Sequence, residues 1–398
     1  MLFTLEALEA EHGDALLLHY GSASAPKLIV IDGGPPRVWR RTLRPRLDEL
    51  RAALVGEDEA LPIQVMMVSH IDEDHIGGLL GLTRVLRRER DDDDPASYDV
   101  LRLWHNAFED VLDDGGAPAA ISAAMPAGAA AASKQIAAAL PFEPDAEPAR
   151  AVVASVDQGR QLRDDARFLD IAINSPFQGM VRRASGLPKR RRFGNGLSFE
   201  VLGPSQDRLD ALREKWQAVL RKKATVSSAA FLAEAAAFVD RSAFNLASIV
   251  GVARAGGNSI LLTGDARGDH VRDAVRDAGL VENGVAHFDV FKVPHHGSQR
   301  NVTTEFFEEV TADHYVISAN GKDGNPDPPM LGMLLDARGS AEYTIHLTNA
   351  VPHAVDFLDA NRAGKRFRVV TRPDAARSLR IDLRDELPSE LVAADADD

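Results

Sequence analysis

Three groups of polar residues each follow directly on a run of apolar residues, and this arrangement constrains the fold more than any other feature of the chain. The groups are Ser69–Gly78, Gly264-Asp265 and His295-His296, and they follow the runs Ile63–Val68, Ser259–Thr263 and Phe288–Val293, respectively. The apolar runs have the length and composition of buried strands. Because strand ends in a layered fold share one edge, we expect the polar groups to meet at one site.

The first group has the residue types of a metal site. His70, Asp72, Asp74 and His75 fall within six residues, directly after the apolar run and before a predicted helix. Imidazole and carboxylate are the ligands that a hydrolytic Zn²⁺ or Mn²⁺ requires. The alternative is a polar loop with Asp72 or Asp74 as a helix N-cap. Capping explains one carboxylate and neither histidine, so we favour the metal site.

The other two groups carry less information when each is taken alone. A Gly-Asp pair such as Gly264-Asp265 at a strand end is ordinarily interpreted as a helix N-cap. Adjacent histidines followed by glycine and serine, as in His295-His296-Gly297-Ser298, are uncommon in structural turns. Three such groups at predicted strand ends are much stronger together, because one sheet edge can bring them all to the same point.

The remaining pattern predicts an α/β protein. Further strands are expected at Leu2–Leu8, Ala15–Tyr20, Lys27–Asp32, Leu197–Leu202, Ser248–Ala253, Tyr315–Ser318, Tyr343–Leu347 and Phe367–Val370. Helices are expected at Leu43–Leu54, after Gly77-Gly78 as far as Arg90, and at Asp207–Lys223 and Ser228–Phe238. We interpret residues 1–398 as one large domain with an insertion at approximately 106–195 and an acidic, frayed tail at approximately 386–398.

Composition limits the possible metal ligands, the cellular location and the binding partners. The 398 residues include no cysteine, so any metal must be held by histidine and carboxylate, and a cytoplasmic location is expected. The first residues lack the pattern of a signal peptide, and no stretch approaches the ~20 apolar residues of a membrane helix. Lys plus Arg is 46 against 60 for Asp plus Glu, a net charge of −14. That balance disfavours whole-surface binding to nucleic acid but allows a local basic groove.

The order of the motifs resembles the metallo-β-lactamase superfamily. These motifs are Asp32-Gly33-Gly34, His70-x-Asp72-x-Asp74-His75, Thr263-Gly264-Asp265 and His295-His296-Gly297-Ser298. In particular the chain resembles the nuclease-type domain of the ComEC DNA-uptake proteins, a subgroup with aspartate at the position of Asp72. The resemblance covers roughly 1–105 and 195–350 and does not include the membrane channel of those proteins. It implies a four-layer αββα sandwich with two divalent metal ions, Zn²⁺ or Mn²⁺, at one edge between the sheets.

The resemblance also implies a role for each residue. His70 and Asp72 would bind the first metal, Asp74 and His75 the second, and Asp265 would bridge both. His295 or His296 would complete the coordination of the second metal. Asp32 would orient one of the ligands without binding metal itself. His105 is the best positional candidate for the mid-chain histidine, or it merely packs beside Trp104. The segment Asn325-Pro326-Asp327-Pro328 departs from the ComEC pattern, which has histidines there.

The predicted activity is hydrolysis of phosphodiesters, in DNA or RNA, by a metal-activated water, with Asp74 and Asp265 as catalytic residues. Ser298, Asn245 and Ser248 are candidate phosphate donors, or simply polar residues of turns and strands. Two arginine-rich segments are candidate nucleic-acid contacts, or solvated charged faces. They comprise Arg37, Arg40, Arg41, Arg44 and Arg46, and Arg182, Arg183, Lys189, Arg190, Arg191 and Arg192.

Two alternatives stay open at this point. The same fold also carries hydrolases of small molecules, such as lactones, lactams, thioesters or cyclic nucleotides, and fold alone does not separate these substrates. The other alternative is a recognition or effector subunit of a larger complex. Presence of every ligand of the first motif argues against a site without catalytic function.

Overall fold

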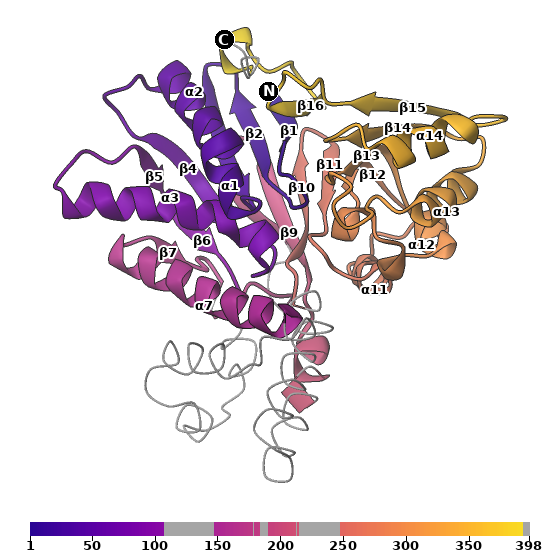
Figure 1. The fold of residues 1–398 in the computed structure, drawn as a ribbon, viewed down its shortest axis with the longest axis horizontal. Helices are drawn as coiled ribbons and strands as arrows, with labels where there is room; N and C mark the ends of the chain where they lie inside the picture. The colour runs from indigo at the N-terminus through magenta and orange to yellow at the C-terminus, as the bar shows by residue number, and fades with distance from the viewer. Residues whose placement is uncertain (107–146, 178, 184–189, 212, 215–246, 393–398) are drawn as a thin grey trace.

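The computed structural model describes residues 1–106, 147–177, 179–183, 190–211, 213–214 and 247–392. These residues form a mixed α/β structure with two sheets of eight strands each. In Figure 1 the two sheets lie side by side in the middle, with one set of helices outside each of them.

The first sheet has the strand order β16-β1-β2-β3-β4-β6-β7, with β5 paired to β4. Its strands are β1 (Leu2–Leu8), β2 (Leu16–Ser22), β3 (Ala25–Ile31), β4 (Leu61–Met67), β5 (Tyr98–Val100), β6 (Arg102–Trp104), β7 (Ala172–Ile173) and β16 (Ser378–Asp382). Strands β1 to β3 are antiparallel, whereas β3, β4 and β6 are parallel. Strands β3 and β4 therefore end at the same edge of the sheet.

The second sheet has the strand order β15-β14-β13-β12-β11-β10-β9-β8. Its strands are β8 (Arg190–Gly194), β9 (Leu197–Gly203), β10 (Val250–Ala255), β11 (Asn258–Leu262), β12 (Ala286–Lys292), β13 (Val310–Ile317), β14 (Glu342–Leu347) and β15 (Arg366–Thr371). Strands β8 to β11 are antiparallel, and β11 to β15 are parallel. The parallel half places the ends of β11, β12 and β13 at one edge.

Helices cover the outer face of each sheet (Figure 1). The first sheet is covered by α1 (Pro36–Val38), α2 (Arg44–Leu54), α3 (Glu73–Asp91) and α7 (Glu147–Phe168), with a π-helical turn at Trp39–Leu43. The second is covered by α11 (Gly268–Asp277), α12 (Thr304–Glu309), α13 (Pro328–Arg338) and α14 (Pro352–Ala360). Helix α11 is typical, because its buried Val271, Ala274 and Val275 share one face and the charged residues lie on the other.

Three hydrophobic cores hold these parts together. One joins the first sheet to its helices, and another joins the second sheet to α11–α14. The third lies between the sheets and takes residues from both, such as Leu18 from β2 and Ile260 from β11. A strand such as β12 has a core on each face, since Val290 belongs to the core between the sheets and Phe291 to the core under the helices.

The structure changes two expectations about the periphery. Part of the predicted insertion belongs to the fold itself, since Leu162 and Ala166 of α7 are fully buried against α3 and β7 and β8 extend the two sheets. The predicted frayed tail is packed as far as it is described, because Leu387 and Leu391 enter the core beside α2. Most of the helices expected at Asp207–Lys223 and Ser228–Phe238 lies outside the described residues.

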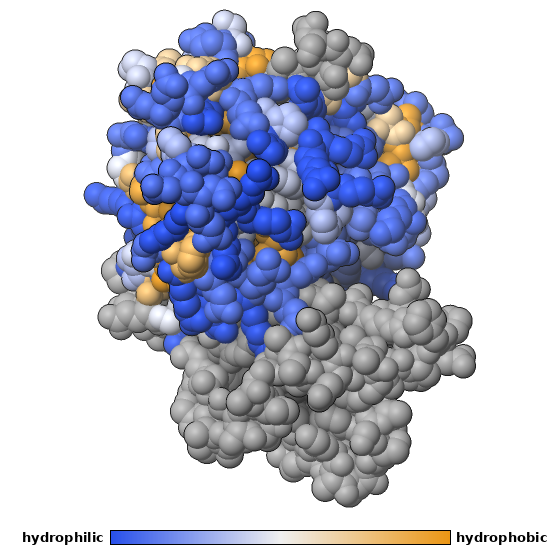
Figure 2. Space-filling view, turned by 60° about the vertical axis from the view of Figure 1, so that its left-hand side comes forward, coloured by the Kyte–Doolittle hydropathy of each residue, from blue (hydrophilic) through white to orange (hydrophobic). Residues whose placement is uncertain are grey.

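The described surface carries little apolar area. On the face drawn in Figure 2, hydrophilic residues predominate and hydrophobic residues form small, separate groups. The large hydrophobic side chains that are exposed among the described residues are Leu101, Phe168, Val370 and Val392. Within the same ranges, no helix combines the length and apolar character needed to cross a membrane.

Candidate metal centre

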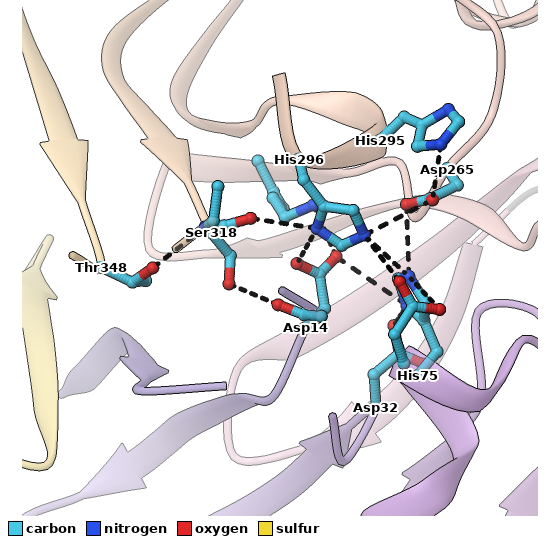
Figure 3. A network of polar contacts seen from close by, with 12 residues as sticks. Asp14, Asp32, His75, Asp265, His295, His296, Ser318 and Thr348 are labelled. Carbon is cyan, nitrogen blue, oxygen red and sulfur yellow. Dashed lines mark hydrogen bonds and ion pairs between the residues drawn. The ribbon is translucent and has the colours of Figure 1, made fainter. Parts of the chain in front are cut away.

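Loops from both sheets meet at one edge and bring a group of histidines and aspartates together (Figure 3). The first sheet contributes the β1–β2 loop, the residue after β3, and the segment between β4 and α3. The second sheet contributes the loops after β11 and β12. All three polar groups singled out in the sequence lie here, as the shared-edge argument predicts.

The segment between β4 and α3 places four candidate ligands in one tight turn. Helix α3 begins at Glu73, before Gly77-Gly78 and not after them as expected, so Asp74 and His75 lie in its first turn. Asp72 occupies the N-cap position, but its side chain makes no capping hydrogen bond. Its carboxylate instead lies 3.3 Å from Nε2 of His70. Capping therefore does not explain this carboxylate.

Asp265 is the central residue of the group. Its Oδ1 lies 3.3 Å from Nε2 of His75, and its Oδ2 lies 3.5 Å from Nε2 of His296. The same Oδ2 is 3.8 Å from Nε2 of His70 and 3.7 Å from Nε2 of His295. Helix α11 begins at Gly268 with Arg267 at the N-cap, so Asp265 is not a capping residue.

The two adjacent histidines have an uncommon backbone. His295 has φ 49° and ψ 47°, and His296 has φ 54° and ψ 20°, so both lie in the left-handed region. Each such residue costs on the order of 1–3 kcal/mol, and conformations of this kind cluster at functional sites. The turn buries His296, with Nε2 3.3 Å from both Nε2 of His75 and Oδ2 of Asp74, and leaves His295 one third exposed.

An outer ring of polar groups faces the Nδ1 atoms of these imidazoles. Asp32 lies 2.9 Å from Nδ1 of His75 and accepts hydrogen bonds from the backbone N–H and the hydroxyl of Ser69. Nδ1 of His296 lies 3.0 Å from the carbonyl oxygen of Ser318 and 3.4 Å from Oδ1 of Asp14. Acceptors on the Nδ1 side leave Nε2 free as a ligand atom, which is the usual arrangement around metal-binding histidines.

Sequence reasoning missed two members of this ring. Asp14 was not among the candidate site residues, and Lys292 was expected only as part of the strand Phe288–Val293. Their side chains are each 1% exposed, and Nζ of Lys292 lies 2.5 Å from Oδ2 of Asp14. The available signal was a lysine directly after the apolar pair Val290-Phe291, because a buried lysine requires a buried partner of opposite charge.

The ionisable groups are strongly coupled. Burial by itself would raise the pKa of Asp265, but His296 and His75 hold it well below the usual value. Burial would likewise lower the pKa of His296, yet Asp265 and Asp14 raise it to about 10. The pKa of Asp74 is also lowered despite burial, because His75 and His296 lie beside it. Carboxylate charge is thus concentrated where several nitrogen atoms converge, an environment that favours cations.

The residues fit a divalent metal ion. Two sets of potential ligand atoms lie within 4.8 Å of one another, Asp14, His75, Asp265 and His296 in one set and His70, Asp74 and His75 in the other. Nε2 of His70 and Oδ1 of Asp265 are buried and have no hydrogen-bond partner among the described residues. Such atoms are costly without a partner, and imidazole and carboxylate suit Zn²⁺ or Mn²⁺. Asp14 is better placed to support His296, since it pairs with Lys292 and faces Nδ1.

The other predicted site residues differ in their placement. His105 is buried, which lowers its pKa to about 3, and it is in neither set of potential ligands. Ser298 is buried beside the histidines, and its N–H donates to the carbonyl oxygen of His295. Ser248 is also buried, and its hydroxyl has no hydrogen-bond partner among the described residues. Asn245 lies outside the described residues.

The first arginine-rich segment is largely neutralised by acidic neighbours. Arg46 is 1% exposed and forms a fork with the buried Glu6, so it cannot contact a substrate. Its neighbours Arg37 and Arg41 pair with Glu11, and Arg44 pairs with Asp48. The prediction that this segment forms a free basic surface is wrong for Arg46, whose partner lies 40 residues earlier in the chain.

In the second arginine-rich segment, Arg183 lies beside Pro204 and pairs with Asp277, whereas Arg190, Arg191 and Arg192 lie on the edge strand β8. Arg190 pairs with Glu200, and Arg191 lies over the ring of Phe177. Arg192 is paired in register with Ser198 in β9. The candidate metal centre lies beyond the other end of that strand, near Gly203. Arg190, Arg191 and Arg192 therefore do not flank the metal-ligand group. Lys189 lies outside the described residues.

Comparison with known proteins adds no assignment. No protein-family model matches the chain, and a search of curated proteins finds no match. The geometry of the candidate site is therefore the basis for a functional proposal.

Proposed function

We propose that the chain is a metal-dependent hydrolase of the metallo-β-lactamase superfamily, acting on phosphodiester bonds as a phosphodiesterase or nuclease. Two helix-covered sheets that pack on each other support the assignment of a four-layer αββα sandwich. The candidate site at the edge between the sheets, with its motif order from Asp32 to Ser298, supports the same assignment.

One observation carries this proposal. Nε2 atoms of His75 and His296, which come from different sheets, lie 3.3 Å apart, and Asp74 and Asp265 face them. Their Nδ1 atoms face acceptors on the opposite side of each ring. Imidazoles oriented in this way present lone pairs to a common point, which is the requirement for binding a cation and has no use in a purely structural turn.

The residues divide between two ion positions around Asp265. Asp74, His75 and His296 form one position, and His70 and Asp72, with His295 at its open side, form the other. Divalent cations held there, zinc or manganese, would supply Lewis acidity that lowers the pKa of water towards ~7 and neutralises charge on the substrate. Asp74, which is partly exposed at 23%, is placed to accept a proton from the attacking water.

The donor set favours phosphodiesters among the substrates of such sites. Three aspartates, Asp72, Asp74 and Asp265, make the group rich in hard oxygen ligands, which Mn²⁺ and Mg²⁺ accept as readily as Zn²⁺ does. Paired ions clamp both the attacking and the leaving oxygen of a phosphodiester during in-line displacement. A partly open side at Asp72 and His295 gives a substrate access to the group.

The test combines metal content with substrate preference. We expect the purified protein to contain one or two equivalents of zinc or manganese, measured by mass spectrometry of the metals. It should hydrolyse bis-p-nitrophenyl phosphate and cleave single- or double-stranded DNA, with activity lost in chelator and restored by Mn²⁺ or Zn²⁺. A chromogenic lactam and a lactone serve as the comparison substrates. Turnover of these, with none of the phosphodiesters, would replace the proposal with a small-molecule hydrolase.

A further inference from the structure

A cavity of about 330 Å³ is lined by residues that follow the metal-ligand loops after β11 and β12. Arg267, Arg272 and Arg300 line it, together with Asp269, Asn301 and Thr303. Arg267 is two residues after Asp265, and Arg300 is two residues after Ser298. The two loops touch, because a Cβ added to Gly268 would lie 2.8 Å from the carbonyl oxygen of Asn301. The loops that carry the metal-ligand group therefore also shape this cavity.

The arginines of the cavity are not fully neutralised by their neighbours. Arg267 forms a fork with Asp269, at 3.0 Å for both contacts. Nε of Arg272 is buried without a hydrogen-bond partner, and its nearest carboxylate, on Glu309, is 4.0 Å away and already forms a fork with Arg276. Arg300 is exposed and makes no hydrogen bond or ion pair with any residue the structure describes. Two guanidinium groups thus retain unused donors.

Unused guanidinium donors in a concave site indicate an anionic ligand. Arginine presents N–H groups in a planar fork that matches the oxygens of phosphate, and such charge-assisted hydrogen bonds are about twice as strong as neutral ones. The cavity also includes the start of α11, where backbone N–H groups favour negative charge. Asp269 and Glu305 also line the cavity and limit its positive charge, so a site for one phosphate group fits better than a broad basic surface.

We propose that Arg267, Arg272 and Arg300 form a subsite for a phosphate group of the substrate other than the one that is cleaved. This inference rests on the proposed phosphodiesterase function and extends it. The phosphate comes either from the backbone of a nucleic-acid strand or from the terminal phosphate of a short nucleotide. Both sources present the same chemistry to the arginines, and the length of the substrate distinguishes them.

The direct test measures anion binding without catalysis. Metal-free full-length protein in chelator is titrated with pyrophosphate by calorimetry, for the wild type and for the variants Arg272→Gln and Arg300→Gln. Arg368→Gln is the matched control, since Arg368 is an exposed arginine on β15 of the same sheet and its loss changes the net charge equally. Each cavity variant should weaken binding about tenfold, and the control should bind as the wild type does. Equal affinity in all four proteins, or no binding by the wild type, overturns the subsite.

The kinetic test identifies the source of the phosphate. Arg300→Gln should raise KM about tenfold for an oligothymidylate and leave hydrolysis of bis-p-nitrophenyl phosphate unchanged, because that compound has no second phosphate. A raised KM also for the dinucleotide pTpT, but not for TpT, assigns the subsite to a terminal phosphate. A raised KM for the oligomer alone assigns it to the strand backbone. Unchanged KM for every substrate contradicts the subsite, whereas a wild type without phosphodiesterase activity refutes the proposed function and leaves the pyrophosphate titration to decide.

Discussion

Nζ of Lys292 lies 2.5 Å from Oδ2 of Asp14, and the two side chains are each 1% exposed. Lys292 ends β12 in the second sheet, and Asp14 lies in the β1–β2 loop of the first. The pair therefore joins the two sheets through opposite charges directly behind His296. Burial would raise the pKa of Asp14, but Lys292 and His296 lower it to about 2, so the carboxylate stays ionised.

Breaking the pair from one side should destabilise the protein. Lys292→Met leaves the buried Asp14 without its cation, and we expect the free energy of unfolding to fall by about 3–5 kcal/mol in chemical denaturation. The double variant Asp14→Asn with Lys292→Met should recover part of that loss, since no charge remains unpaired. Asp273→Asn removes the partner of Arg208 in a more exposed ion pair and should cost less than about 1 kcal/mol. If Lys292→Met and Asp273→Asn lowered the free energy of unfolding equally, the proposed contribution of the buried pair to stability would be contradicted.

Asp74→Ala should abolish turnover and leave the fold intact. The residue lies on a polar edge and is 23% exposed, so its removal takes away a ligand and proton acceptor without opening a core. We expect kcat to fall by at least about a hundredfold, with the melting temperature of the metal-free protein unchanged to within a few degrees. Asp313→Asn, at an exposed position of β13, serves as the control. Wild-type turnover by the Asp74 variant would refute the proposed mechanism.

Asp32→Asn should weaken metal binding without removing a ligand. Asp32 has φ 56°, a conformation that asparagine also accepts, so the backbone is preserved. The amide is a poorer partner for Nδ1 of His75 and for Ser69, and we expect metal affinity to fall about 10–100-fold in a competition assay with a chromophoric chelator. The metal-free protein should keep its secondary structure by circular dichroism. Unchanged affinity would show that Asp32 does not orient His75.

His346 should make stability depend on pH in the acidic range. Burial, together with the nearby His314, lowers the pKa of His346 to about 3 from the ordinary 6.5. Between these values the unfolded chain binds a proton that the folded protein excludes, so stability is lost as pH falls below about 6.5. The contribution amounts to about 1.4 kcal/mol per pH unit. Denaturation in chelator between pH 7 and 5 should show a flatter pH dependence for His346→Gln than for the wild type, and parallel curves would contradict this assignment.

The sequence was sufficient to predict the inner part of the candidate site. His70, Asp265 and His296 each come shortly after a buried strand whose end could be located, and the strand ends of the two sheets meet at one edge. The residues of the outer ring were harder to predict. Asp14 and Lys292 are far apart in the chain, and neither belongs to a recognisable sequence pattern. Only the tertiary structure shows that the two charges are buried together.

Surface charge could not be assigned from sequence for a related reason. Arg46 belongs to an arginine-rich segment, but its side chain enters the core to pair with Glu6, whereas Arg300 is isolated in sequence and lies in the basic cavity. A local count of charges ignores distant partners, and it is the distant partner that decides whether an arginine is available. Helices α11–α14 were not among the helices expected from the sequence, although α11 has its apolar residues on one face.

The ligand atoms of the candidate centre come from both sheets, and this has a mechanical consequence. His70 and His75 lie in the segment that follows β4, whereas Asp265 follows β11 and His296 follows β12. A cation bound between them would hold the two sheets together at their interface. Its binding free energy would have to be supplied before the two sheets, each with its helices, could separate. Mechanical separation of the two sheets should therefore require more force with metal than in chelator. The interface between the sheets should open before either sheet unfolds.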